Sequence, residues 1–438
     1  MPKVSQPLGA MLVEAGVITS LDLKVALESQ KHVPVLLGVT LVDLGIATED
    51  QILPILALQL NRIDVHLAAK GEEPSSVSEA LQQILRTAVE AGATDIHLEP
   101  YSAAEVKVRV RIDGILREMQ IPRVIHEQFP ATVSRVKIMA SLDIAEKRMP
   151  QEGRTTIHSG GREMDLRISI LPTRHGESVV IRVLQSEIPL GLSGLGMDAE
   201  ATECLEHLLT RRSGLILVTG PTGCGKTTTL YACLDKLNDS TKKIVTIEDP
   251  VEYTLPGAMQ MQVMPQIDLT FSRLLKTVLR HDPNVIMVGE IRDMETAEVA
   301  IRTALTGHIV LSTLHTNDAC STITRLQEMG VEPYLISSSL TCSIAQRLVR
   351  TICSRCQGKR CVACLGLGLK GRTGIFEVMV MDDEIRAKTL KQASVEEIRQ
   401  YARKRGMGTL FEDGTRKVKA GLTTLEELER AIHHDELS

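Results

Sequence analysis

The sequence predicts an α/β fold in which helices cover a mostly parallel sheet, with a smaller α+β domain and helical segments at both ends of the chain. Three observations predict it. Short apolar runs alternate with helical segments beyond residue 196, which is typical of a parallel sheet covered on both faces. Runs with period-2 apolar patterning occupy much of residues 95–184 and indicate half-buried strands. The 438 residues also exceed one ordinary core, so several domains are expected.

Composition excludes several classes of protein. Hydrophobic residues make up 43% and charged residues 24% of the chain, the balance of a globular protein rather than a disordered or fibrous one. Aromatic residues are only 2%, with no Trp, which disfavours a platform for stacking nucleic-acid bases. The net charge of −5 provides no general attraction to nucleic acid or to anionic lipid.

The hydropathy of the sequence indicates the cellular compartment in which the protein is expected. The sequence has no run of about 18 uncharged apolar residues, and its N-terminus lacks a signal-peptide pattern. We therefore expect a cytoplasmic protein that contacts membranes only through partners. The nine cysteines fit this compartment if they stay reduced.

An internal repeat with an offset of 29 residues occupies the first part of the chain. The segment that begins at Leu8 recurs from Leu37, and the helix start at Thr19 recurs at Thr48. Acidic residues follow both Thr residues, as expected of capped helix N-termini. The pattern predicts a duplicated helical docking module over residues 1–65.

An α+β domain is expected at residues 77–188, between a polar linker at 66–76 and a Gly- and Pro-containing hinge at 189–196. Helices are predicted near 77–91 and 124–141, and strands at 95–101, 105–112, 115–121, 154–158, 163–171 and 177–184. Asp113-Gly114, between two of these strands, predicts a tight hairpin turn.

The α/β domain is expected at residues 197–438. Its strands are predicted at 215–219, 244–248, 285–289 and 309–314, and several short helices at 383–434. Ligands of open parallel sheets bind beyond the carboxyl ends of the strands. The residues that follow these four strands are therefore the candidates for a site.

A phosphate-binding loop follows the first of these strands. Gly220, Gly225, Lys226 and Thr227 match the pattern G-x-x-x-x-G-K-T between a strand and a helix, the context in which the motif binds nucleotides. The glycines let backbone N–H groups face the phosphates, Lys226 reaches the outer phosphates, and the Thr227 hydroxyl reaches Mg²⁺. We therefore predict ATP and Mg²⁺ as ligands. The predicted nucleotide-binding residues are Gly220, Pro221, Thr222, Gly223, Cys224, Gly225, Lys226, Thr227 and Thr228.

Acidic residues follow the second and third strands. Glu248-Asp249 ends the second strand, and Gly289-Glu290 ends the third. Gly289 stands where such strands normally carry the Asp that orients Mg²⁺. Glu290 or the Glu248–Asp249 pair must therefore provide both metal orientation and activation of water.

Two histidines, His308 and His315, bracket the fourth predicted strand. A single histidine at a strand end is usually structural, but two of them in a chain with a phosphate-binding loop indicate a functional role. We include both among the catalytic candidates and expect one to sense the terminal phosphate.

Four cysteines form an insert at residues 353–364. Cys353 and Cys356 make one C-x-x-C pair, and Cys361 and Cys364 make a second. Four soft ligands in a reducing compartment are the composition of a structural Zn²⁺ site. Only four residues separate the pairs, so tetrahedral closure is tight. Another metal or cluster, and free thiols, are the alternatives.

These motifs closely resemble the secretion-ATPase superfamily, and within it the motors of type II secretion and type IV pilus assembly. The resemblance covers about residues 75–380 and implies a RecA-like P-loop ATPase domain with a PAS-like α+β domain. It also implies that Glu248 activates water and that Glu290 holds Mg²⁺ through water. The matching segments are GPTGCGKTTT, TIEDPVEY, DPNVIMVGEIRDMETA, TGHIVLSTLHTNDA, ATDIHLEP, VRVRIDG, KIMASLDIAEKRMPQEGR and DLRISILPTRHGESVVIRVL.

Motors of this family are hexamers in which arginines from an N-terminal domain complete each active site. By position, Arg167 and Arg182 resemble these arginines, with Arg135, Arg148 and Arg154 as substitutes. An arginine supplied by a neighbouring subunit accelerates phosphoryl transfer by roughly 10³–10⁵. The resemblance thus implies a homo-hexamer whose active sites are shared between subunits.

The resemblance also implies partners. They are an inner-membrane platform protein and a membrane-anchored docking protein, with assembly of pilin-like filaments for type II secretion or type IV pilus extension. We expect a cytoplasmic protein, peripheral at the inner membrane. The N-terminal repeat resembles a cyclic di-GMP module whose copies typically begin Arg-Leu-Gly. Its triplets here begin with Pro7 and Leu36, so cyclic di-GMP binding is not expected. The alternative function is a nucleic-acid-translocating ATPase, which the acidic charge and scarce aromatics disfavour.

Overall fold

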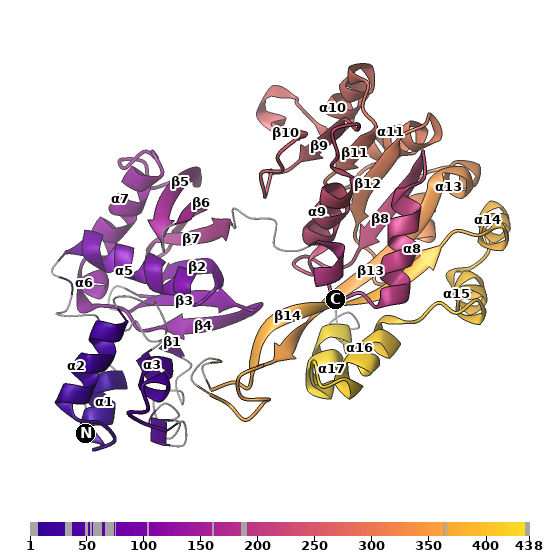
Figure 1. The fold of residues 1–438 in the computed structure, drawn as a ribbon. Coiled ribbons are helices and arrows are strands. Elements are labelled where there is room, and N and C mark those ends of the chain that lie inside the picture. The colour runs from indigo at the N-terminus through magenta and orange to yellow at the C-terminus, as the bar shows by residue number, and fades with distance from the viewer. Residues whose placement is uncertain are drawn as a thin grey trace. The chain divides into compact units, whose positions relative to one another are not determined.

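The chain folds into two compact units (Figure 1). One comprises residues 1–186 and 352–371, and the other comprises 187–351 and 372–438. No helix in the described part of the chain is long and apolar enough to cross a membrane. The structure, a computed structural model, describes residues 8–30, 37–48, 51–52, 55, 64–65, 74, 76–102, 105–159, 162–184, 191–361, 364 and 366–433.

In the described part of the N-terminal repeat lie the short helices α1 (Leu8–Glu14), α2 (Ser20–Ser29) and α3 (Leu37–Asp43). Thr19 and Asp22 form a capping box at the start of α2, in which each side chain accepts a hydrogen bond from the other residue's backbone N–H. Gly9 lets α1 approach Leu23, because a Cβ at this position would lie 2.5 Å from Leu23 Cδ1. Pro7, Leu36 and most of the expected linker at 66–76 lie outside the described residues.

A seven-stranded sheet forms the body of the first unit, in the order β1-β4-β3-β2-β7-β6-β5. Its strands are β1 (Asp64–Val65), β2 (Ala93–Pro100), β3 (Val106–Ile112), β4 (Ile115–Met119), β5 (Gln151–Ser159), β6 (Arg162–Thr173) and β7 (Gly176–Leu184). Apart from β1 and β4, neighbouring strands are antiparallel. Asp113 (φ 49°) and Gly114 (φ 81°) form the expected tight turn between β3 and β4, since a type I′ turn needs two positive φ values.

Three helices pack on this sheet around one shared apolar core: α5 (Val77–Glu90), α6 (Arg123–Glu127) and α7 (Phe129–Met139) (Figure 1). The prediction of a single helix at 124–141 is wrong, because the chain leaves helical geometry at Gln128 (φ −123°, ψ 40°). Pro130 has no backbone N–H to donate into the preceding turn, which favours a new helix start there. The apolar strand residues face the helices, so the polar ones occupy the opposite face of the sheet.

A second seven-stranded sheet lies in the other unit, in the order β10-β9-β11-β12-β8-β13-β14. Its strands are β8 (Gly214–Thr219), β9 (Ile244–Glu248), β10 (Ala258–Gln262), β11 (Val285–Val288), β12 (Ile309–Leu314), β13 (Leu340–Ile352) and β14 (Leu369–Val380). The pairings from β10 to β13 are parallel. β9, β11 and β12 are buried along their whole length, as expected of a parallel sheet covered on both faces.

Two apolar clusters lie on this sheet. One contains residues of α8 (Ala199–Leu209) and α9 (Lys226–Leu237), and the other contains residues of the remaining helices. The four short helices after β14 confirm the expectation for residues 383–434. The remaining helices are α10 (Phe271–Val278), α11 (Met294–Leu305), α12 (Ser321–Glu328), α13 (Pro333–Ser339), α14 (Asp383–Leu390), α15 (Val395–Lys404), α16 (Leu410–Lys419) and α17 (Leu425–His433).

The sheet is larger than the four strands predicted from the sequence. β10, β13 and β14 are not among the predicted strands. β13 breaks the apolar pattern because it buries polar residues such as Ser343 and Gln346, which hydrogen bond to Thr322 and Thr229. In the expected hinge, the described residues 191–196 bury two leucines in the apolar cluster around α8 and α9.

Candidate nucleotide site and cysteine cluster

The phosphate-binding loop connects β8 to α9. Gly220, Gly223 and Gly225 have φ values of 145°, 80° and 90°, a backbone conformation that favours glycine. A Cβ at Gly220 would also lie 2.6 Å from the carbonyl oxygen of Gln346 on β13. The loop therefore needs its glycines both for backbone shape and for close packing against β13.

Lys226 begins α9 and folds back over the loop. Its Nζ donates hydrogen bonds to the carbonyl oxygens of Gly220 (2.6 Å) and Pro221 (3.0 Å). Burial lowers the pKa of Lys226, and the nearby charge of Glu290 partly offsets this. A partly desolvated ammonium at a helix N-terminus is stabilised by a bound anion. The loop therefore fits the phosphates that its sequence predicts.

Polar residues follow the neighbouring strands at the same edge of the sheet. Val288 pairs with Ile247, and Leu314 pairs with Thr219, so Glu248, Glu290 and His315 all lie at or just beyond the carboxyl edge. Glu290 is the centre of this group. Its carboxylate lies 2.5 Å from Arg292 Nη2 and 3.7 Å from His315 Nε2.

The two histidines are not brought together. His315 lies beside Glu290 and follows β12, whereas His308 precedes β12 and approaches the carbonyl oxygen of Thr303, with 3.1 Å from Nδ1. The strand between them holds six residues, which separates its ends by roughly 16–20 Å. Within this chain, His308 therefore lies at the opposite edge of the sheet from His315, because residues that bracket one strand lie at opposite edges of a sheet, and this placement does not support its predicted catalytic role.

His315 has the environment of a neutral imidazole. Burial and the positive charge of Lys226 lower its pKa, although Glu290 opposes the shift. At neutral pH, the ring can thus both donate and accept a hydrogen bond.

Gly289 is the residue that replaces the usual Asp. A Cβ at this position would lie 3.3 Å from the carbonyl oxygen of Ile247 and 3.5 Å from Glu248 Cα. β9 and β11 are adjacent and in register here, so a side chain at Gly289 would press on the strand end that carries Glu248. The close packing of β9 against β11 therefore explains why Gly stands here in place of the usual Asp.

The glutamate at the end of β9 is buried. Glu248 is 2% exposed and accepts hydrogen bonds from Tyr231 on α9 (2.6 Å) and from Thr246 (2.6 Å). Gln260 on β10 is a third donor, at 3.2 Å. None of these three hydrogen-bond donors was predicted from the sequence. Tyr231 lies only four residues beyond Thr227 in the sequence. Its hydroxyl contacts Glu248 on β9, which is distant in the sequence, so the contact could not be predicted.

β13 contacts the segment that follows His315, and this contact was not predicted from the sequence. Arg347 is 3% exposed and donates to the carbonyl oxygen of Asn317, which lies just beyond His315 (2.9 Å). Thr219, the last residue before the loop, accepts a hydrogen bond from the backbone N–H of Thr316 (2.7 Å). These contacts connect residues 316–317, which follow His315, with β13 and with the residue that precedes the phosphate loop.

The candidate arginines lie on the first unit. Arg167 on β6 is directly opposite Arg182 on β7, and Arg154 on β5 is directly opposite Arg167. Arg167 donates to Glu152 (2.8 Å), and Arg182 donates to Asp95 (2.9 Å). Like charges directly opposite each other destabilise a sheet, and Glu152 and Asp95 offset this cost for Arg167 and Arg182.

The four clustered cysteines converge on one point. All four are buried, and their sulfur atoms lie within 4.8 Å of one another. Three of the sulfur–sulfur distances are 3.8 Å: Cys353–Cys361, Cys356–Cys364 and Cys361–Cys364. A tetrahedral zinc site with bonds of about 2.3 Å has sulfur–sulfur separations of roughly 3.8 Å. The short connection between the pairs therefore permits the geometry of a Cys₄ zinc site.

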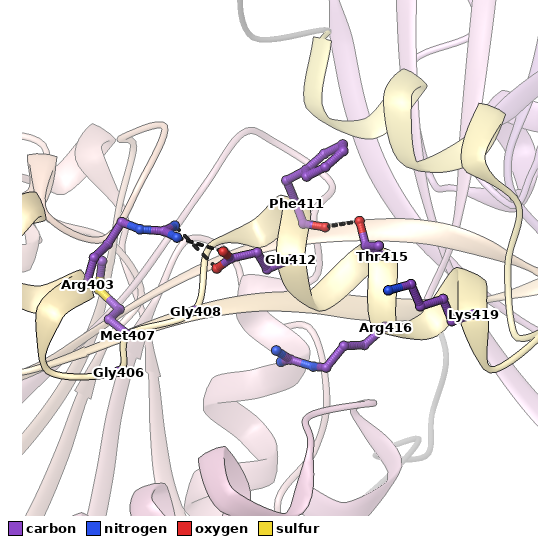
Figure 2. Close-up of a pocket in the computed structure, with 9 residues that line it drawn as sticks. All are labelled: Arg403, Gly406, Met407, Gly408, Phe411, Glu412, Thr415, Arg416 and Lys419. Atoms are coloured by element: carbon purple, nitrogen blue, oxygen red, sulfur yellow. Dashed lines mark hydrogen bonds and ion pairs between the residues drawn. The ribbon is translucent and has the colours of Figure 1, made fainter.

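A separate surface pocket lies on the C-terminal helices. Its volume is about 540 Å³, and its lining comes from α15, α16 and the segment between them (Figure 2). Figure 2 shows Arg403 donating to Glu412 within the lining. None of the site residues predicted from the sequence lines it.

Comparisons with known proteins agree with this site. The sequence profile of the family described as type II/IV secretion system protein matches residues 70–430. Type II secretion system protein HxcR of Pseudomonas aeruginosa is 48% identical over 82% of this chain and 78% of its own length. The type II secretion system ATPase E of Vibrio cholerae is 43% identical over 82% of this chain and 76% of its own length.

A pilus protein and two solved structures are also similar. The type IV pilus assembly ATPase PilB of Thermus thermophilus is 45% identical over 81% of this chain and 43% of its own length. The pilus retraction motor PilT with bound ADP is 30% identical, with a TM-score of 0.58 over 80% of this chain and 95% of its own. The Legionella pneumophila ATPase DotB shares the fold, with a TM-score of 0.66, 21% identity and coverage of 84% of this chain and 98% of its own. The chain therefore belongs to the type II/IV secretion system protein family, as an ATP-hydrolysing enzyme of the secretion and pilus motor kind.

Proposed function

We propose that this chain is one subunit of a hexameric motor that couples ATP hydrolysis to the assembly of pilin-like filaments, in type II secretion or type IV pilus extension. The observation that carries the proposal is the set of Lys226, Glu290 and His315 at the carboxyl edge of the parallel sheet, with Glu248 at the end of the adjacent strand. Relatives of both kinds support it, since they include a type II secretion ATPase and a pilus assembly ATPase.

In this proposal, residues 220–228 hold the phosphates of ATP through backbone N–H groups and Lys226. We propose that Thr227 and Glu290 hold Mg²⁺, which when bound neutralises charge on the phosphates. Glu248 takes the proton of the attacking water. His315 senses the terminal phosphate, a role that its lowered pKa and its position beside Glu290 support.

Arg167 and Arg182 are proposed to complete the active site of a neighbouring subunit. Their like-charged pairing is unfavourable within one sheet. It becomes favourable when an anion lies against it, and a guanidinium is suited to the charge that develops on a transferring phosphoryl group. This is the reason to expect turnover only in the assembled oligomer.

The cysteine cluster is proposed to hold structural Zn²⁺ through Cys353, Cys356, Cys361 and Cys364. The sulfur–sulfur distances support a tetrahedral ion. Backbone N–H groups of Cys361 and Gly368 also donate to Cys364 Sγ at 3.2 and 3.1 Å. Such donors stabilise a thiolate.

Residues 1–65 are proposed to dock the motor on a membrane-anchored protein, and the hexamer to act on an inner-membrane platform protein. The protein would then be cytoplasmic and peripheral at the inner membrane, without binding nucleic acid. Since the triplets of the repeat lack the arginines, we do not propose cyclic di-GMP as a ligand.

The proposal is tested with full-length protein and the cytoplasmic segments of candidate platform proteins. We expect ATP hydrolysis that rises with protein concentration as the oligomer forms, and further stimulation by the correct platform segment. Hydrolysis that DNA stimulates and platform segments do not would instead support the alternative of a nucleic-acid translocase.

A further inference from the structure

Glu248 is buried, yet both of its carboxylate oxygens have a donor. The Tyr231 hydroxyl donates to Oε2 at 2.6 Å, and the Thr246 hydroxyl donates to Oε1 at 2.6 Å. Distances this short are typical of hydrogen bonds to an ionised acceptor. Because one donor holds each oxygen, the carboxylate cannot rotate without breaking a buried hydrogen bond.

Two strands and a helix contribute to this arrangement. Thr246 and Glu248 are two residues apart on β9, so their side chains project on the same face. Gln260 on β10 pairs with Thr246 and donates to the Tyr231 hydroxyl oxygen (3.0 Å) and to the carbonyl oxygen of Tyr253 (2.8 Å). The Tyr231 hydroxyl lies 2.6 Å from Glu248 Oε2 and 3.0 Å from the carbonyl oxygen of Tyr253, so Glu248 is the nearer acceptor for its single proton.

The environment of Tyr231 keeps its hydroxyl protonated, so that it can donate a hydrogen bond to Glu248. It is fully buried, and its ring packs edge-on against Tyr253 with centroids 5.1 Å apart. Burial and the negative charge of Glu248 raise the pKa of Tyr231, so the phenol keeps its proton at any pH at which the enzyme works.

We propose that Tyr231 and Thr246 are positioning residues that hold the Glu248 carboxylate in one orientation for activating water. An ionised carboxylate has about four acceptor sites. Tyr231 occupies one site on Oε2, while Thr246 and, at longer range, Gln260 approach Oε1. Among the described residues no other donor contacts the Glu248 carboxylate, so the second site on Oε2 is the one for the water proton. The inference rests on the proposed role of Glu248 as the base.

The test uses the full-length protein and separates kcat from KM. Tyr231→Phe and Thr246→Val should each lower kcat by about 10- to 100-fold, with KM for ATP changed less than about twofold, because neither residue belongs to the phosphate loop. Thr246→Ser keeps the hydroxyl and should keep most of the activity. Tyr401→Phe is the matched control. It removes another tyrosine hydroxyl bonded to a carboxylate, that of Asp382, and should hydrolyse ATP at the wild-type rate.

Glu248→Gln separates failure of this inference from failure of the proposed base. If Glu248→Gln hydrolyses ATP normally, the base assignment itself is wrong. If Glu248→Gln is inactive while Tyr231→Phe and Thr246→Val keep the wild-type kcat, the positioning role is overturned. The double variant Tyr231→Phe/Glu248→Gln should be no slower than Glu248→Gln alone, and a further loss would show that Tyr231 acts by another route. If Tyr231→Phe does not fold, as judged by its melting temperature, the Thr246→Val and Thr246→Ser pair decides.

Discussion

Arg167 and Arg182 lie directly opposite each other on β6 and β7, and each donates to a carboxylate on a neighbouring strand. The two acids, Glu152 on β5 and Asp95 on β2, lie on strands on opposite sides of this arginine pair. The sheet thus brings together two cations that are 15 residues apart in the sequence, and each is paired with its own carboxylate.

We expect Arg182→Ala and Arg167→Ala to lower kcat by roughly 10³-fold or more while nucleotide binding is retained, because such arginines meet charge that develops only in the transition state. Steady-state hydrolysis and the affinity for a fluorescent ADP analogue measure the two quantities. Arg174→Ala, at an exposed site in the turn between β6 and β7, is the control and should remain active. Wild-type turnover of Arg182→Ala at saturating protein would exclude this arginine from the site.

Metal analysis of protein prepared without chelator should find about one zinc per chain. Cys361→Ser should lower this to less than about 0.1 and should expose residues 352–371 to proteolysis, because one ligand of the tetrahedron is lost. Cys204→Ser, outside the cluster, should leave the zinc content unchanged. A different metal in the native protein, or four thiols that react freely, would favour the alternatives to zinc.

Gly289→Asp introduces the residue that strands of this kind commonly carry, and we expect it to impair this enzyme. The new Cβ would lie 3.3 Å from the carbonyl oxygen of Ile247, so the end of β9 must shift, at a cost of about 1–3 kcal/mol in stability. Glu248 moves with it, and kcat should fall by about 10-fold or more. Urea unfolding and ATP hydrolysis measure the two effects. Gly191→Ala, which has open space around it, is the control. An active and stable Gly289→Asp would contradict the packing argument.

The lowered pKa of His315 makes the stability of the fold depend on pH. Since burial and Lys226 lower this pKa in the folded state from its ordinary 6.5, the unfolded chain binds the proton more tightly. Stability from the neutral ring is therefore present above pH 6.5 and is lost as the pH falls below it. The melting temperature of the wild type should drop more steeply between pH 7.5 and about 5.5 than that of His315→Gln. His281→Gln, at an exposed position, should follow the wild type, and equal slopes for all three proteins would disprove the expectation.

Local motifs could be predicted where neighbouring residues in the sequence determine the backbone conformation. The phosphate loop, the Asp113-Gly114 turn and the cap at Thr19 all depend on residues adjacent in the sequence. The parallel direction of the strands followed from their alternation with helices, and with it the edge that carries Glu248 and Glu290.

Contacts between distant segments were not predictable in the same way. The Tyr231 hydroxyl finds Glu248 only after α9 packs on β9, and Gln260 comes from a strand that has no apolar pattern. β13 was not predicted because it buries polar residues, among them Gln346, which accepts a hydrogen bond from Thr229 on α9. The distance between His308 and His315, by contrast, could have been calculated from the length of the strand between them.

Mixing subunits tests the central claim, a shared active site in an oligomeric ATPase, most directly. Lys226→Ala removes the phosphate-binding lysine but keeps the arginines, while Arg182→Ala does the reverse. Each variant alone should be inactive. Co-expressed in equal amounts, they should regain about a quarter of the wild-type rate, the share of sites that combine an intact loop with an intact neighbouring arginine. A co-expressed mixture that stays as inactive as either variant alone would contradict the account.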